Sequence, residues 1–302
     1  MALQKEIWIQ SIIEALFADN TFAARSVDHS GFVDNLTVHV PNAGALPAVS
    51  KTRPFSPGDN LTAPAERTDV DLNYSIENYY LGPITIPHAE AVELSYDKRQ
   101  SVLAGIKAAL TEAIYADLVY KWLPASVTAQ PTSGANAPAY IPTATGSRKS
   151  VQKADIRKLR TIFDKWNAPQ EGRNLLLDAE MYGQLLSDLT ETEAAAFLAS
   201  ANAQQGTLGM LYGFNIYLRS QVAKSTSAGV SKLWTASAAA TDSAAGIAWS
   251  SSMVSRAVGD IVIYDNAGDA LMFGDVLSGE VRAGGSFMRN DKKGVVLFYQ
   301  GT

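Results

Sequence analysis

Residues 41–66 show almost no helical or strand periodicity. The stretch holds five prolines and two glycines. It is also longer than the roughly 12–15 residues that an unstructured connection in a compact domain usually reaches. A loop of this length is normally functional or disordered. The chain is therefore predicted to carry a long extended segment that a small compact fold does not need.

Alternating apolar and polar residues flank this stretch on both sides. Leu36–Val40 alternates before it, and the clearest period-2 segment of the chain follows it. The apolar positions of that second segment are Val70, Leu72, Tyr74 and Ile76. Ile84 and Ile86 come next, between two prolines, a pattern typical of an edge strand or an exposed ribbon.

These segments predict an exposed two-stranded ribbon, which is marginal in water without a surface to cover it. Copies of the same chain supply such a surface most economically. Residues 4–18 predict a short amphipathic helix that also needs a surface, in its own fold or on a neighbour. The residues predicted to contact neighbouring subunits are Val70, Leu72, Tyr74, Ile76, Ile84, Ile86, Ile12 and Phe17.

Residues 97–122 predict a long amphipathic helix. Apolar residues from Val102 to Trp122 trace one stripe along it. At 1.5 Å per residue the helix would be about 38 Å long, long enough to serve as a spine for other layers. A second helix is predicted to open at Ser150 and to end near Trp166.

The middle of the chain alternates between strand and helix patterns. Arg173–Leu177 predicts a buried strand, and Asp178 is placed to cap the helix that follows it. Thr190–Glu193 has the spacing of a capping box at the start of another helix. Phe214–Leu218 predicts a further strand.

Two other segments have a loop-like composition, and the end of the chain is rich in strand patterns. Residues 124–147 predict a loop, and the Ala- and Ser-rich residues 223–252 resemble a linker, although Gly246–Trp249 predicts a strand within them. The strand and turn predictions for the last fifty residues are Ile261–Tyr264, a turn at Asp265–Gly268, Leu271–Phe273, and a pair formed by Val281 and Val295–Tyr299. The whole predicts an α+β fold.

The composition removes several kinds of chemistry. The chain of 302 residues has no cysteine, which excludes disulfides, thiolate metal sites and cysteine nucleophiles. It has no phosphate-binding, dinucleotide or zinc-protease motif, and its net charge of −5 argues against a nucleic-acid binder acting by bulk charge. The sequence has no run of about 20 apolar residues, so no membrane span is predicted. No enzyme activity, cofactor or metal is expected.

One constellation keeps an enzymatic alternative open. Asp69 and Asp71 lie two residues apart on a predicted strand, so their side chains share one face. With His88 they could hold a metal ion, and this metal-dependent hydrolase is the alternative of another class. The simpler interpretation, which we favour, is that both carboxylates form the polar face of an amphipathic ribbon.

The densest basic stretch begins at the predicted second helix. Lys153, Arg157 and Arg160 recur at i, i+4 and i+7 and therefore line one helix face. Such a stripe can engage phosphate backbones without reading sequence, although it is more often a solvated helix face.

The order of these elements resembles a known family. Gly172–Asp178 with the helix that follows, then Gly206–Gly209 and Gly213–Ser220, form a strand, a helix and a Gly-x-x-Gly approach to a second strand. Ile247–Trp249 and Arg256–Asp260 are also similar. Together with the extended segment and the long helix, they resemble the major capsid proteins of tailed bacteriophages, which have the Hong Kong 97 type fold.

The resemblance implies a division of the chain into parts. It implies an N-terminal arm at 1–30, an extended β loop at 31–95 and a peripheral domain with the spine helix at 96–149. An axial domain at 150–255 would follow, and β-rich strands at 256–302 would complete both domains.

The resemblance also implies a function. The chain would be a structural coat protein that self-assembles, as pentamers and hexamers, into the icosahedral virion shell around packaged double-stranded DNA. Assembly would take place in the host cytoplasm, with portal, scaffold or decoration proteins as further partners and no membrane. Lys153, Arg157 and Arg160 are the DNA-facing candidates. An encapsulin-like compartment shell is the alternative within the same fold.

Overall fold

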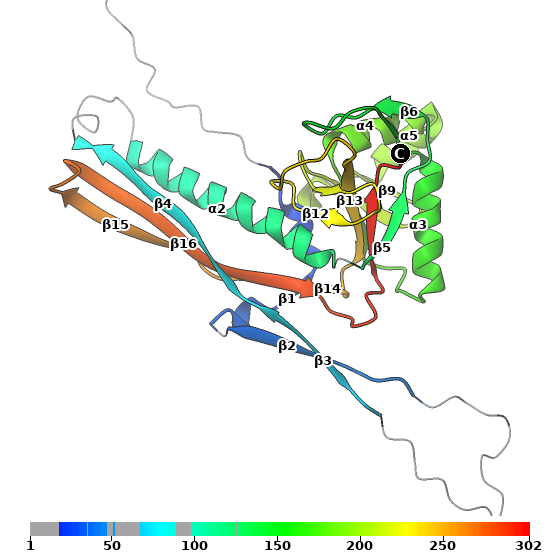
Figure 1. Ribbon diagram of the computed structural model, residues 1–302, viewed down its shortest axis with the longest axis horizontal. Helices are drawn as coiled ribbons and strands as arrows, with labels where there is room; N and C mark the ends of the chain where they lie inside the picture. The colour runs from blue at the N-terminus through cyan, green and yellow to red at the C-terminus, as the bar shows by residue number, and fades with distance from the viewer. Residues whose placement is uncertain (1–17, 35, 47–50, 52–66, 89–97, 125) are drawn as a thin grey trace, which may run out of the picture.

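A computed structural model describes residues 18–34, 36–46, 51, 67–88, 98–124 and 126–302. These residues form an elongated body, a compact body and a projecting β ribbon (Figure 1). The predicted N-terminal helix at 4–18 and the contact candidates Ile12 and Phe17 lie outside the described residues, apart from Ala18. The same holds for most of the proline-rich stretch. The α+β class predicted from the sequence is confirmed.

The elongated body is one long helix packed on a five-stranded sheet. The helix is α2 (Lys98–Trp122), as predicted. The strands are β1 (Val27–Asp28), β4 (Glu77–Pro87), β14 (Val254–Val258), β15 (Val262–Asp269) and β16 (Gly274–Phe287). The central strand β16 pairs with β4 along one edge and with β15 and then β14 along the other.

Helix α2 lies on this sheet through its predicted apolar stripe. Ile106, Leu110 and Ile114 are buried, and they pack against Ile86 of β4 and Leu277 of β16. Removing this much apolar surface from water is the main force that holds a helix on a sheet. The last turn of α2 reaches the compact body, so the helix joins the two bodies.

The compact body is built on an eight-stranded sheet. Its path runs β12-β11-β13-β8-β10-β9, and β17 lies on the other edge of β13 and pairs in turn with β5. The strands are β5 (Thr128–Pro131), β8 (Arg173–Leu177), β9 (Gly209–Leu211), β10 (Phe214–Leu218), β11 (Ala223–Ser225), β12 (Ser231–Lys232), β13 (Ser243–Ser250) and β17 (Val295–Tyr299). The helices are α3 (Lys153–Lys165), α4 (Ala179–Asp188) and α5 (Glu191–Ala199).

Strand β8 shows how the two faces of this sheet are covered. Leu175 and Leu177 pack into the cluster that includes residues of α3 and α4, whereas Leu176 packs into the cluster that includes the end of α2. Successive side chains of a strand point to opposite faces, so a strand covered on both sides is apolar throughout. This explains why the continuous run at 173–177 marked a buried strand.

Two of the predicted N-terminal caps mark the observed starts of their helices, and one does not. Asp178 accepts a hydrogen bond from the Met181 N–H at 2.7 Å, as predicted for the start of α4. The capping box of Thr190 and Glu193 at the start of α5 is also confirmed. The predicted start of α3 at Ser150 is wrong, because the Ser150 N–H is committed to a carbonyl in the segment before it and the helix begins only at Lys153.

Three further predictions need correction. Residues 124–147 are not wholly a loop, since they contain β5, β6 (Asn136–Pro138) and the first residue of β7 (Ser147–Lys149). Residues 223–252 are not a linker, because β13 lies at the centre of the compact sheet. Val281 does not pair with Val295–Tyr299, because β16 and β17 belong to different sheets.

The last correction concerns the hairpin at the far end of the elongated body. The turn predicted at Asp265–Gly268 lies inside β15, which continues to Asp269 through a register shift. Gly268 has a positive φ of 69°, which fits a β-bulge as well as it fits a turn. The true turn is at 270–273, so Leu271–Phe273 is not a strand.

The remaining elements are short. The ribbon consists of β2 (Thr37–Asn42) and β3 (Val70–Ser75), and three 3-10 turns are η1 (Thr21–Ala24), η2 (Ser30–Phe32) and η3 (Ala203–Gln205). Among the described residues, no helix combines the length and the apolar character that crossing a bilayer requires.

Candidate assembly surfaces

The ribbon of β2 and β3 extends away from the elongated body (Figure 1). At its far end, the Asn42 side chain donates to the Met288 carbonyl and accepts from the Asn290 N–H, each at 3.1 Å. Its strands are antiparallel and in register from Thr37 opposite Ser75 to Asn42 opposite Val70. They pair only with each other among the described strands, so both outer edges present unpaired backbone groups. An edge of this kind is a template for pairing with another chain.

The base of the ribbon is fixed inside the chain. Tyr74 and Ile76 are buried in a small cluster with Val33, Val38 and Ala257. Both were predicted to contact neighbouring subunits, but the intramolecular cluster already covers them. Packing within one chain, rather than between chains, accounts for their apolar character.

A third predicted contact residue is also internal. Ile86, near the end of β4, packs under α2 against Ile106 and Leu110. Ile84, two residues earlier, is 37% exposed. On the ribbon, Val70 is exposed and Leu72 half-buried. The surface candidates among the described residues are therefore Val70, Leu72 and Ile84.

Sequence reasoning missed several exposed apolar residues. Leu36 and Leu46 flank β2, and both are largely exposed. Leu271 and Phe273 are exposed at the tip of the β15–β16 hairpin. The adjacent apolar residues at 271–273 were visible in the sequence, but a run of three is equally consistent with a short strand, and only the pairing register separates the two.

The predicted metal constellation does not come together. The carboxylate of Asp69 pairs with Arg67 and accepts the Gly44 N–H at 2.9 Å, which lowers its pKa. Asp71 contacts the Nδ1 atom of His39 at 2.5 Å. Both carboxylates therefore already have hydrogen-bond or ion-pair partners in the ribbon or in the residues next to it.

His88 is far from both carboxylates. It follows β4, and β3 and β4 run onward in nearly one direction between Asp71 and His88 (Figure 1). Seventeen extended residues at about 3.3 Å each span up to roughly 56 Å. Asp69, Asp71 and His88 therefore cannot share one metal ion, and the hydrolase alternative is not supported.

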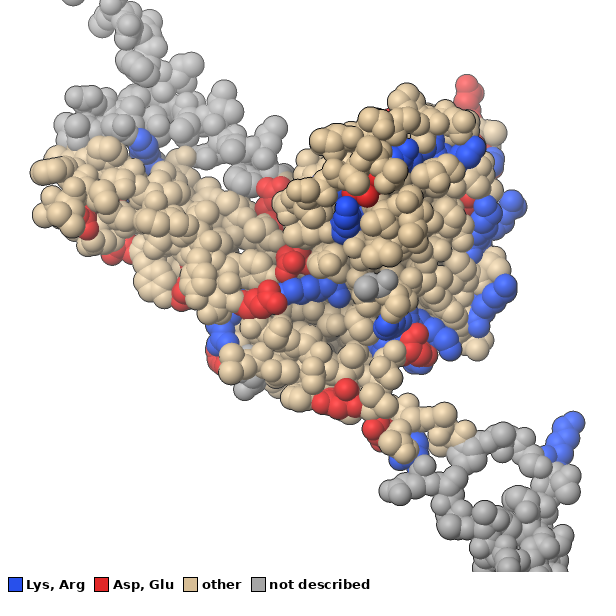
Figure 2. Space-filling view, in the orientation of Figure 1, with Lys and Arg blue, Asp and Glu red and all other residues tan. Residues whose placement is uncertain are grey.

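The basic face of α3 is only partly free. Lys153 forms an ion pair with Glu193 of α5, with Nζ 2.7 Å from the carboxylate. Arg160 lies 3.5 Å from Asp164, one turn further along the same helix. Arg157 is exposed, and Figure 2 shows Lys and Arg side chains gathered at the edge of the compact body where α3 runs.

The ion pair of Lys153 and Glu193 changes the pKa of the Glu193 carboxyl group. A hydrogen bond from Lys153, with further ones from the Thr190 backbone and hydroxyl, lowers the pKa of Glu193 to about 2. Lys153 is thus partly neutralised and a weaker candidate for phosphate contact than Arg157.

The chain was compared with known proteins at three levels. No family model and no curated protein matches it. Solved structures do match. One titled "Mycobacterium phage Che8" has 18% identity and a TM-score of 0.69, and the match covers 98% of this chain and 97% of that one.

Two further structures are similar over the same extent. The capsid structure of the cyanophage P-SCSP1u has 17% identity and a TM-score of 0.68, with 98% of this chain and 93% of that one covered. The capsid of Ralstonia phage GP4 has 13% identity and a TM-score of 0.63, with 99% and 96% covered. The chain therefore has the fold of tailed-phage capsid structures, the Hong Kong 97 type fold that its sequence predicted.

Proposed function

We propose that the chain is the major capsid protein of a tailed phage, a structural protein whose copies assemble into an icosahedral shell around double-stranded DNA. The observation that carries this proposal is the extent of the structural match to the capsid structure of the cyanophage P-SCSP1u, which covers 98% of this chain and 93% of that chain. Because so little of either chain lies outside the match, the elements that serve a shell in one protein have counterparts in the other.

The ribbon supplies a physical mechanism for assembly. The two unpaired strand edges can pair with a strand of another chain, and the exposed side chains of Leu36 and Val70 gain free energy when they leave water. Contact with a neighbouring copy covers both. Each contact is small, but a closed shell repeats it in every subunit, and multivalency makes the lattice stable. We propose that these copies form pentamers and hexamers. The shell would assemble in the host cytoplasm and become part of the virion.

A sharp test removes residues 43–69, which join the two strands of the ribbon, and leaves β2 and β3 in place. Asn42 and Val70 are paired across the two strands, so a two-residue Asn-Gly turn can join them in place of residues 43–69. The shortened chain is expected to be a folded monomer with an unchanged far-UV spectrum and no shells by negative-stain microscopy. A second variant keeps the length of residues 47–66 but replaces them with Gly and Ser. It shows whether assembly depends on the length of this segment or on its side chains.

The outcomes separate two claims. Shells from the unaltered chain and none from the shortened chain support residues 43–69 as a lattice contact. Normal shells from the shortened chain overturn that role and leave the strand edges of the ribbon as the proposed contact. An unaltered chain that stays monomeric at high concentration overturns the capsid function itself.

The DNA contact proposed for this shell does not depend on base sequence. It uses Lys153, Arg157 and Arg160 on α3, of which Arg157 is the most available. Backbone contacts of this kind position a protein on DNA without selecting a site. Portal, scaffold and decoration proteins are the further partners proposed.

A further inference from the structure

A cleft of about 460 Å³ lies where α2 of the elongated body meets the compact body (Figure 1). One of its walls is formed by α2 and by Tyr79 of β4. The other wall is formed by the segments of the compact body that follow β10 and β12. Cavities of this size are typical of small-molecule sites, which occur preferentially where two parts of a fold meet.

The helix wall consists of an apolar strip between two carboxylates. Ala109, Ala113 and Ala116 line the cleft, and at 3.6 residues per turn they fall within about 60° of one another around α2. Glu112 lies at one edge of this strip and Asp117 at the other. Their backbone positions are separated by about 7.5 Å along the helix axis. A ligand that reaches both carboxylates must therefore be elongated and must cross an apolar surface.

Both carboxylates have capacity for further hydrogen bonds. Glu112 is half-buried, and its carboxylate accepts no hydrogen bond from any residue that the structure describes. The Oδ2 atom of Asp117 contacts the Tyr79 hydroxyl and, at 3.1 Å, the Nζ atom of Lys121. Since a carboxylate offers about four lone-pair sites, Asp117 can still accept from a ligand.

Arg219 also lines the cleft, but its guanidinium group already has protein partners. The residue is 3% exposed. Its three nitrogens donate to the Asn20 side chain at 3.2 Å, to the Gln221 carbonyl at 2.6 Å and to the Glu112 carbonyl at 3.3 Å. An anionic ligand would have to compete with these bonds, whereas the two carboxylates favour a ligand with positive charges.

The opposite wall is apolar and held in place. Leu233 and Trp234, which follow β12, line this side of the cleft. The Nζ atom of Lys224 lies 5.3 Å from the centroid of the Trp234 ring and donates to the Ala236 carbonyl at 2.7 Å. The wall is thus positioned before a ligand arrives, which lowers the entropy cost of binding.

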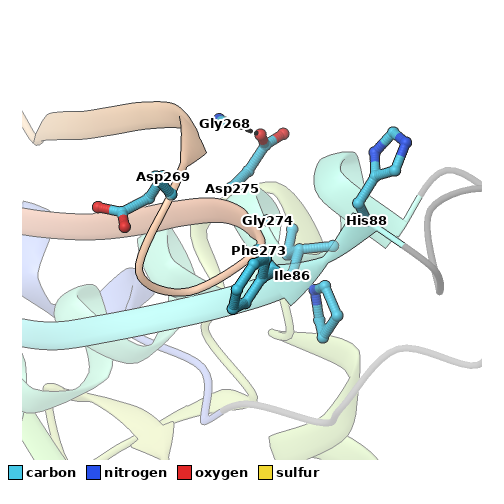
Figure 3. Close-up of a pocket in the computed structure, with 9 residues that line it drawn as sticks. Ile86, His88, Gly268, Asp269, Phe273, Gly274 and Asp275 are labelled. Carbon is cyan, nitrogen blue, oxygen red and sulfur yellow. Dashed lines mark hydrogen bonds between the residues drawn. The ribbon is translucent and has the colours of Figure 1, made fainter.

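Another hollow, of about 580 Å³, shows by contrast what the cleft adds. It lies beside the turn between β15 and β16, and Asp269 and Asp275 are among its lining residues (Figure 3). Asp269 accepts from the N–H groups of Leu271 and Met272, and Asp275 accepts from the Gly268 N–H at 3.0 Å. These carboxylates hold the turn itself, so they do not indicate a site for a cation.

We propose that the cleft binds a linear polyamine, whose ammonium groups reach Glu112 and Asp117 while its methylene chain lies on the alanines and against Trp234. Ammonium and carboxylate groups form charge-assisted hydrogen bonds, and the methylene groups gain free energy when they leave water. Because the ligand contacts both bodies, it stabilises the arrangement in which they meet. The site does not depend on the shell function proposed above.

The first test titrates spermidine into the full-length chain by calorimetry. At about 0.15 M salt, exposed charges are screened beyond about 8 Å, which suppresses binding to the general surface. About one spermidine per chain is expected to bind and to raise the unfolding temperature. Glu112→Gln should weaken binding roughly tenfold or more, because it removes a charged acceptor. Glu171→Gln, in the exposed loop before β8, loses the same charge and should bind like the unaltered chain.

The second test fills the cleft with a side chain. Ala113 is exposed on α2 and leucine is a good helix former, so Ala113→Leu is expected to fold normally and to abolish spermidine binding. Ala104→Leu is the matched control, since Ala104 is also an exposed alanine of α2 but lies outside the cleft. Spermidine affinity that is unchanged in both Glu112→Gln and Ala113→Leu overturns the proposal, and so does the absence of binding to the unaltered chain.

Two further probes separate the polyamine from simpler ligands. Butanediol keeps a carbon chain without positive charges, and Mg²⁺ keeps positive charge without a carbon chain. Neither is expected to displace spermidine at equal concentration. Displacement by butanediol would show that the cleft does not recognise charge, and displacement by Mg²⁺ would show that it does not recognise the chain. Either result overturns the assignment to a polyamine.

Discussion

The indole N–H of Trp122 donates a hydrogen bond of 2.8 Å to the carbonyl of Ser255. Trp122 is the last residue of α2, and Ser255 lies in β14, so the bond ties the spine helix to the sheet beneath it. The Trp122 ring is also fully buried, with its centroid 6.1 Å from that of Phe22 and 5.6 Å from that of Trp249. Because Trp249 belongs to the compact sheet, this one side chain joins the two bodies.

We predict that Trp122→Phe destabilises the chain by about 1–3 kcal/mol, because it removes a donor from a buried carbonyl and shrinks a packed side chain. Urea unfolding of the monomer measures the change. Tyr120→Phe, two residues earlier on the same helix and 40% exposed, should change the free energy of unfolding by less than about 0.5 kcal/mol. Equal stability of the two variants would contradict the role given to Trp122.

Glycine allows α2 to approach β16 closely. A Cβ atom at Gly285 would overlap the Leu118 side chain and lie 2.6 Å from the Ser255 carbonyl oxygen. Since the carbonyl is backbone and cannot move aside cheaply, Gly285→Ala is predicted to destabilise the chain by roughly 1–3 kcal/mol.

The matched control for this prediction has the opposite sign. Gly105 lies within α2, and a Cβ atom there would have no atom within 4 Å. Gly105→Ala is therefore expected to stabilise the chain by about 0.5–1 kcal/mol, through the higher helix propensity of alanine. Thermal unfolding of both variants tests the pair, and a stabilising Gly285→Ala would rule out the close-packing argument.

These packing relations show which parts of the fold the sequence could predict. The spine helix, the strand at 173–177 and the cap at Asp178 all depend on signals within a few residues, and all three were predicted. The prediction of a linker at residues 223–252 was wrong because a stretch rich in small residues occurs both in flexible linkers and in tightly packed strands. At Gly246 of β13, a Cβ atom would overlap the Leu176 carbonyl, so the position needs glycine.

The candidate surfaces were predicted less well, for a different reason. Alternation identifies the apolar face of a strand but not what covers that face. Tyr74 and Ile76 are covered by Val33, Val38 and Ala257, and the last of these is distant in the sequence. Only the three-dimensional packing separates these residues from Val70, which remains exposed on β3, the strand that also holds Tyr74.

The ion pair of Lys153 and Glu193 predicts a specific acid sensitivity. Because the pKa of Glu193 falls to about 2 in the folded chain from an ordinary value of 4.5, its ionised form is favoured by folding. Its contribution to stability is complete above about pH 4.5 and disappears as the pH falls towards 2.

Glu193→Gln should therefore lower the unfolding temperature at pH 7, and the difference from the unaltered chain should shrink between pH 4.5 and 2. Glutamine can still accept the Thr190 backbone hydrogen bond, so the comparison reports the charge. Glu171→Gln, in the exposed loop before β8, is the control and should have the unfolding temperature of the unaltered chain at pH 7. A difference that stays constant down to pH 2 would show that the ion pair does not set the stability of this region.

The DNA contact proposed for the basic face of α3 predicts how binding would depend on salt. Each phosphate contact adds about 0.9 to the slope of log K against log salt concentration on duplex DNA. Arg157 is exposed and Arg160 only loosely paired with Asp164, so the double variant Arg157→Gln, Arg160→Gln should reduce the slope by up to about 1.8. Lys107→Gln, at an exposed lysine on α2, is the control and should leave the slope unchanged.

The measurement is a salt titration with duplexes of two unrelated sequences, which should give the same slopes because phosphate contacts carry no base information. An unchanged slope in the double variant would move the DNA contact away from α3, whereas a loss restricted to one duplex would show that these arginines read bases.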